Sequence, residues 1–236
     1  MTLPAQYAST PVKHPGPPLW LLAGLYVLLF NIGLAPVTML GGLPYWPGPW
    51  EPASVIVPYF QTHASRVLFC VFFQFGATIC LGLFTATVVS RLQFLGLRAA
   101  GVQIALLGGF LTVFNGAIAS FATWAMIHPS VAPYPSTLLG LYYFSFAVGG
   151  PGFSVPMGLL MAGVSVTSAF RKLLPLWIVV LGLVLAAAGE LSVFYFLSPK
   201  ALFLIPLTRF PGFIWIVAVG IAMPHSRPAE ARALAA

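Results

Sequence analysis

Long runs of apolar residues follow one another along the chain, and most polar residues gather in the segments between them. Six of these runs reach the length of about 20 residues that crosses a hydrocarbon core of about 30 Å. They predict helical spans over residues 18–40, 66–90, 99–127, 137–169, 173–197 and 202–224. We therefore predict an all-α integral membrane helical bundle of about six transmembrane helices, with one domain over residues 18–224 and tails over 1–17 and 225–236.

The composition favours the same fold class. Residues of hydrophobic type make up 60% of the chain and charged residues only 6%, whereas soluble domains carry about 25% charged residues. Such a surface requires lipid as its solvent. We expect residues 19–34 to form a retained first helix rather than a cleaved signal peptide, because the segment before them is long and rich in proline.

The segment over residues 41–65 is rich in proline, glycine and aromatic residues. Its apolar stretches are too short to cross a membrane, so we predict a loop that lies at the membrane interface. Aromatic side chains favour that interface, and here they are Tyr45, Trp46, Trp50 and Tyr59.

The basic residues are distributed unevenly, and the net charge of the chain is +7. Six spans place seven of the ten basic residues on one side, namely Lys13, Arg91, Arg98, Arg171, Lys172, Arg227 and Arg232. An excess of Lys and Arg is typical of cytoplasmic loops. This predicts cytoplasmic N- and C-termini. A basic stripe interleaved with aromatic residues is missing from the sequence, so we expect no nucleic-acid partner.

Two ionisable residues fall clearly within spans, Glu190 and Arg209. Each lies seven residues from the outer end of its span, which is about 10 Å of helix, and a short turn joins the two spans. Because a lone charge within a membrane costs at least about 2.5–3.5 kcal/mol, we expect each side chain to have a partner or water, and their equal depth on adjacent helices allows them to meet as an ion pair. With Arg66, at the outer end of the second span, they are our candidate ligand-binding residues.

Two interpretations of this pair stay open. One is an outward-facing polar site that binds a substrate, an ion or a proton. The other is an ion pair that only fixes helix register. Glu190 follows Gly182 and Ala186 at helical spacing, which places it on a face of small residues that favours close helix packing.

The fourth span contains a cluster of helix-breaking residues: Gly149, Gly150, Pro151, Gly152 and Pro156. Its run of 34 residues would form a straight helix about 51 Å long, far more than a bilayer core requires. Proline removes a backbone donor and glycine lowers helix preference. We therefore predict a kinked or broken fourth helix with these residues as its hinge. The carbonyl groups freed before Pro151 and Pro156 either accept bonds from a ligand or are satisfied by neighbouring helices in a plain proline kink.

Catalytic chemistry finds little support in the chain, which has three acidic residues and no aspartate. We identify no catalytic residues, expect no cofactor and no metal, and lean against an enzyme, with activity on a lipid as a remote alternative. His63, His128 and Glu51 are too scattered for a metal site. Cys70 and Cys80 are about 15 Å apart along one helix, too far for a disulfide.

Three segments, GGPGFSVP (149–156), AGELS (188–192) and PLTRFPGFIW (206–215), resemble uncharacterised bacterial multi-pass membrane proteins of domain-of-unknown-function families. The resemblance implies a bacterial cytoplasmic (inner) membrane and no assigned activity.

The sequence leaves two classes of function open. The first is transport or binding of a small or lipid-like molecule at an outward-facing Glu/Arg site. The alternative is a non-catalytic structural or accessory subunit of a membrane complex. The partners we expect are the lipid bilayer, a small-molecule or lipid ligand, and either further copies of the chain or a partner membrane subunit.

Overall fold

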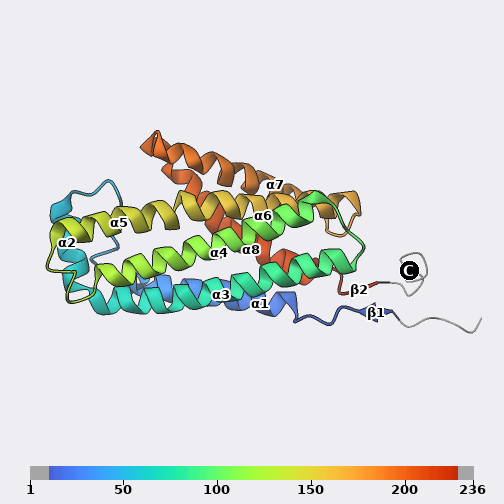
Figure 1. The fold of residues 1–236 in the computed structure, drawn as a ribbon, viewed down its shortest axis with the longest axis horizontal. Coiled ribbons are helices and arrows are strands. Elements are labelled where there is room, and N and C mark those ends of the chain that lie inside the picture. Colours follow the sequence, from blue (N-terminus) through green and yellow to red (C-terminus); the bar gives the residue numbers. More distant parts are fainter. Residues whose placement is uncertain (1–10, 228–236) are drawn as a thin grey trace, which may run out of the picture.

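The computed structural model describes residues 11–227, and most of this range is helical (Figure 1). Six helical segments are long and apolar enough to cross a membrane, which confirms the predicted all-α bundle. The helices are α1 (Leu19–Leu34), α2 (Ala53–Thr62), α3 (Ala64–Phe94), α4 (Ala100–Met126), α5 (Pro135–Gly149), α6 (Pro151–Phe170), α7 (Leu176–Leu191) and α8 (Leu204–Ala222). Short 3₁₀ segments are η1 (Ala35–Val37), η2 (Met39–Gly41), η3 (Ser192–Phe196) and η4 (Pro199–Phe203). The outer parts of both predicted tails, with Arg232, lie outside the described residues.

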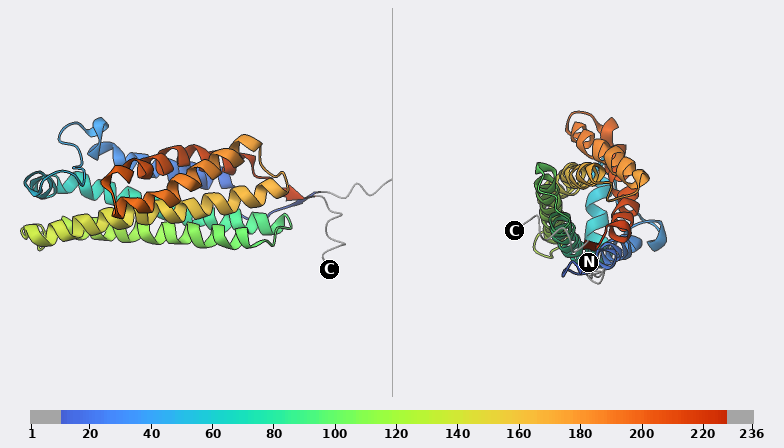
Figure 2. Two further views of the ribbon diagram at one scale, coloured as in Figure 1. Left: turned by 90° about the horizontal axis from the view of Figure 1, so that it is seen from above. Right: turned by 90° about the vertical axis from the view of Figure 1, so that its right-hand side faces the viewer.

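The six spans form a closed ring. Around the ring, α1 packs on α3, α3 on α4, α4 on α5 and α6, α6 on α7, α7 on α8, and α8 back on α1. An end view shows this ring, with α2 lying across its far end (Figure 2). Each span runs antiparallel to the one before it, so both ends of the described chain lie at the same end of the bundle (Figure 1).

Apolar side chains fill the ring over the half that is nearer the termini. Leu81, Phe84, Met157 and Trp215 are almost completely buried in one continuous cluster. The outer surface is also apolar, and Phe72, for example, is 71% exposed. Such a surface suits lipid, which is as apolar as the protein interior.

The fourth span is broken at Gly150, as predicted. Its backbone angles there are φ −89° and ψ −102°, which lie outside the helical region. α5 ends at Gly149, and α6 begins at Pro151, where the missing N–H would in any case lack an intrahelical partner. The break therefore divides one 36-residue segment into two helices that fit better within a bilayer.

The prediction of a loop over residues 41–65 is wrong for part of this segment, because residues 53–62 form α2 despite Pro58 in its interior. Ile56 and Phe60 of this helix are fully buried, and they pack with Leu138 and Tyr142 of α5. Tertiary packing of this apolar face outweighs the hydrogen bond that the proline removes. α2 therefore covers the end of the ring opposite the termini.

The segments before the first span and after the last are paired. β1 (Val12–Lys13) and β2 (Ser226–Arg227) form an antiparallel ladder, and the His14 N–H donates to the His225 carbonyl at 2.8 Å. Arg91 of α3 is buried beneath them and donates to the carbonyl oxygens of Met223 and Pro17. This tail clasp (residues 12–14 with 225–227) holds both ends of the described chain to the bundle.

Candidate functional site

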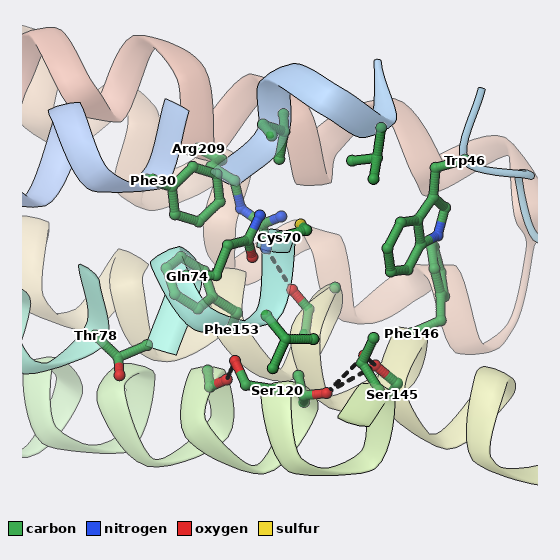
Figure 3. Close-up of a pocket in the computed structure, with 18 of the residues that line it drawn as sticks. Phe30, Trp46, Cys70, Gln74, Thr78, Ser120, Ser145, Phe146, Phe153 and Arg209 are labelled. Atoms are coloured by element: carbon green, nitrogen blue, oxygen red, sulfur yellow. Dashed lines mark hydrogen bonds between the residues drawn. The ribbon is translucent and has the colours of Figure 1, made fainter. Parts of the chain in front are cut away.

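A cavity of about 320 Å³ lies inside the half of the ring away from the termini (Figure 3). Its volume falls at the lower end of the range of about 300–1,000 Å³ typical of small-molecule sites. α1, α3, α4, α5 and α8 contribute most of its walls, and the start of α6 closes it. Six aromatic residues contribute to the lining, and they are Tyr26, Phe30, Trp46, Tyr142, Phe146 and Phe153.

Arg209 of α8 enters the cavity and donates a hydrogen bond from Nη2 to the Gly149 carbonyl, at the helix break. In an unbroken helix this carbonyl would accept from the N–H of Phe153. The turn at Gly150 redirects that N–H to the Gly150 carbonyl instead, at 3.2 Å. The break therefore frees an acceptor within the bundle, and the guanidinium occupies it.

Two aromatic rings flank the same guanidinium. Its central carbon lies 4.6 Å from the centroid of the Phe153 ring and 5.5 Å from that of Phe30, distances at which a ring face attracts a cation. Tyr26 packs 6.0 Å from Phe30 and 5.7 Å from Phe213. The Tyr26 hydroxyl is buried without a hydrogen-bond partner. Arg209 and Tyr26 thus bring two donors to one region of the cavity.

A second carbonyl is freed by Pro156, which cannot donate to the carbonyl of Gly152 four residues earlier. The side chain of Asn115 in α4 donates to this oxygen. Asn115 thus bonds between helices, as amide side chains within membrane spans commonly do. Asn31, in contrast, donates to Val27 of its own helix. The carbonyls released near Pro151 and Pro156 both accept bonds from other spans.

Hydroxyl groups form the wall opposite Arg209 (Figure 3). Thr123 and Ser145 bond to each other at 2.7 Å, and both lie within hydrogen-bond distance of the Ala119 carbonyl. Ser120 donates to the carbonyl of Gly116. Each hydroxyl has a single proton, so these contacts commit the protons and leave lone pairs toward the cavity. This wall accepts hydrogen bonds.

Glu190 lies elsewhere, on the face of α7 that packs against α6. A Cβ built on Gly158 would lie 2.9 Å from the Ala186 carbonyl and 3.1 Å from Glu190 Oε1, which confirms close packing of the small residues. Glu190 Oε1 and Arg209 Nε are both buried without hydrogen-bond partners. Glu190 and Arg209 do not form an ion pair, because Arg209 turns into the ring whereas Glu190 faces α6.

Arg66 does not line the cavity either. It is half-buried near the start of α3, close enough to Tyr59 of α2 for its charge to act on that hydroxyl. Burial raises the pKa of Tyr59 to about 12, and the charge of Arg66 opposes this shift. Of the three candidate ligand-binding residues, the structure therefore brings only Arg209 into the cavity.

The cavity residues that sequence reasoning missed are mostly aromatic. Trp46 and Tyr59 were expected at the membrane interface, but Trp46 packs edge-on against Phe60 at 5.0 Å and lines the cavity, while Tyr59 is only 4% exposed. Tyr26 and Phe30 are ordinary members of an apolar run in the sequence. Among residues 11–227, no three His, Cys, Asp or Glu side chains gather in a group that could hold a metal.

No protein-family model, curated protein or solved structure matches this chain.

Proposed function

We propose that this protein binds a small or lipid-like molecule in the cavity beside Arg209 and acts as a membrane transporter or binding protein. The observation that carries the proposal is a mainly apolar cavity, with six aromatic residues in its lining and one guanidinium inside it. Ionisable residues within a membrane interior are costly, and they commonly mark ligand pathways. In transporters, broken helices that line a cavity form binding sites for substrates and ions.

The setting that we propose is a bacterial cytoplasmic membrane with both termini in the cytoplasm. In this orientation the cavity lies in the outer half of the bilayer. The basic residues Arg98, Arg171 and Lys172 support this orientation, because all three lie in loops at the same end of the bundle as the termini. The ligand then reaches the cavity from the outer side or from the outer leaflet.

Filling the cavity tests the proposal. Trp46 lines the cavity, so a bound ligand changes its fluorescence, and Trp46→Phe provides the background from the other tryptophans. We expect purified protein in nanodiscs of zwitterionic lipid to give a saturable signal with at least one member of a set of eight-carbon amphiphiles (octanol, octanoate and octylamine). Val71→Phe, which places a larger side chain in the cavity, abolishes that signal.

Val184→Phe is the matched control, since Val184 is 60% exposed on the outer face of α7. It leaves binding unchanged. Leu34→Phe is a second cavity-filling variant, for use if Val71→Phe does not elute as folded protein in size-exclusion chromatography. Equal binding by the folded cavity-filling variants and by wild type would contradict the proposal.

A further inference from the structure

The charge in the cavity has no counter-ion in the part of the chain that the structure describes. Arg209 is the one cationic side chain in the lining, and no carboxylate accompanies it. Of the three acidic residues in the chain, Glu51 and Glu190 are described and lie outside the cavity. The contacts of Arg209 with Gly149 and with the two phenylalanine rings stabilise the charge. They do not neutralise it.

The guanidinium also keeps donors that no protein acceptor uses. It has five N–H groups, and the Gly149 carbonyl takes one of them. Nε is buried and has no partner. The Tyr26 hydroxyl is likewise unpartnered in a side chain that is only 1% exposed, and Tyr26 lies within electrostatic range of Arg209. An anionic oxygen would satisfy both groups, since charge-assisted bonds to a guanidinium are strong and frequently bidentate.

The hydroxyl wall and the apolar lining of the cavity restrict the charge and polarity of the ligand that it can bind. The hydroxyl wall of Ser120, Thr123 and Ser145 offers lone pairs and therefore repels an anion. Apart from Thr38, Cys70, Gln74 and Thr78, the remaining lining is aromatic, aliphatic or glycine and favours an apolar body. A cationic ligand would meet Arg209 without any acid to offset the repulsion.

From this arrangement we infer that the ligand is an amphipathic anion, an apolar body with a carboxylate or phosphate group that binds Arg209 and the Tyr26 hydroxyl. The inference rests on the proposed function, because it names the ligand class for the same cavity. The anion comes either from solution or from the adjacent leaflet, and the recognition chemistry is the same.

Trp46 fluorescence in zwitterionic nanodiscs tests the inference with four probes: octanoate, octyl phosphate, octanol and octylamine. We expect octanoate or octyl phosphate to bind at least about tenfold more tightly than octanol, since a hydrogen bond to a charged group is worth about this factor or more. Octylamine should bind most weakly. Acetate and inorganic phosphate, which lack the apolar body, should give no saturable signal.

Two variants test whether Arg209 and Tyr26 donate hydrogen bonds to the anion. Arg209→Gln should remove the preference for the anions and leave octanol affinity within about twofold, whereas Tyr26→Phe should weaken anion binding by about threefold. The matched controls Arg98→Gln and Tyr143→Phe change exposed side chains outside the cavity and should have no effect. Tyr26→Phe decides the question if Arg209→Gln does not fold.

Adding phosphatidic acid to the nanodiscs distinguishes a ligand that comes from the leaflet from one that comes from solution. If the leaflet supplies the ligand, this lipid competes and weakens octanoate binding. If solution supplies it, octanoate affinity is unchanged.

Two negative outcomes are distinguishable. Equal affinity for octanol and both anions in wild type, or an anion preference that survives in folded Arg209→Gln, overturns the inference but leaves the cavity as a binding site. The absence of a saturable Trp46 signal with every amphiphile contradicts the proposed function itself.

Discussion

Arg209 of the last span donates a hydrogen bond to the carbonyl of Gly149, at the point where the fourth span is broken. The contact links the two most unusual features of the sequence, a charge within a membrane helix and a cluster of glycine and proline. It also places both at one cavity. The break and the arginine are therefore best understood as parts of a single site.

The bond from Asn115 to the Gly152 carbonyl should stabilise the bundle only because Pro156 lacks an N–H. We expect Asn115→Ala to lower the free energy of unfolding by about 1–2 kcal/mol, since it leaves a carbonyl unpaired between helices. In a Pro156→Ala background the N–H of residue 156 can donate to the Gly152 carbonyl. Asn115→Ala should therefore lower the free energy of unfolding much less in that background. Denaturant titration in mixed micelles measures both values. Gln103→Ala, on the exposed face of the same helix, is the control, and equal losses in the two backgrounds would contradict this assignment.

The contact between α6 and α7 should not tolerate a methyl group at Gly189. A Cβ there would lie 2.6 Å from the Ser154 carbonyl, so Gly189→Ala forces the helices apart. We expect a loss of about 1–3 kcal/mol in unfolding free energy. Gly24→Ala is the matched control, because nothing lies within 4 Å of its added Cβ, and it should gain about 0.5–1 kcal/mol from helix preference. A similar gain at both positions would show that α6 and α7 are not in this close contact.

The tail clasp should weaken in acid because of His14. The backbone N–H of Gly16 donates to His14 Nδ1, so the ring proton lies on Nε2 and is directed to Ser90 Oγ at 3.0 Å. Burial and the charge of Arg91 lower the pKa of His14 in the folded state. The unfolded chain therefore binds the proton more readily, and stability present above about pH 6.5 is lost as the pH falls through the folded-state pKa.

Thermal midpoints measured between neutral and mildly acidic pH test this pH dependence. Wild type should lose stability across the range, and His14→Gln should lose less. His128→Gln, which changes a histidine at the opposite end of the bundle, should behave like wild type. A pH profile that is identical in wild type and His14→Gln would rule out the titration of His14 as the cause.

The bundle could be predicted from sequence because lipid imposes a simple rule on span length and polarity, and all six spans follow it. The break was predictable for the same reason, since Pro151 and its glycines interrupt a run that is too long for a bilayer. The helix over residues 53–62 was not predictable, because its stability comes from packing against α5, a long-range contact that local sequence does not reveal.

The site was predicted in part. Depth along the helices placed Glu190 and Arg209 at one level, but depth does not specify the direction in which each side chain points around its helix. Rotation directs Arg209 into the ring and Glu190 onto α6. The aromatic lining was missed because Tyr26 and Phe30 look the same in sequence whether they face lipid or a cavity.

The most direct test compares the two charged residues that lie within spans, Arg209 and Glu190, for their contribution to ligand binding. Arg209→Gln and Glu190→Gln each replace one charged side chain with the same neutral amide, and octanoate binding is measured by Trp46 fluorescence in zwitterionic nanodiscs. We predict that Glu190→Gln binds octanoate with an affinity within about twofold of wild type, and that Arg209→Gln binds it at least about tenfold more weakly. Weakened binding in Glu190→Gln together with unchanged binding in Arg209→Gln would contradict the assignment of the site to the cavity beside Arg209.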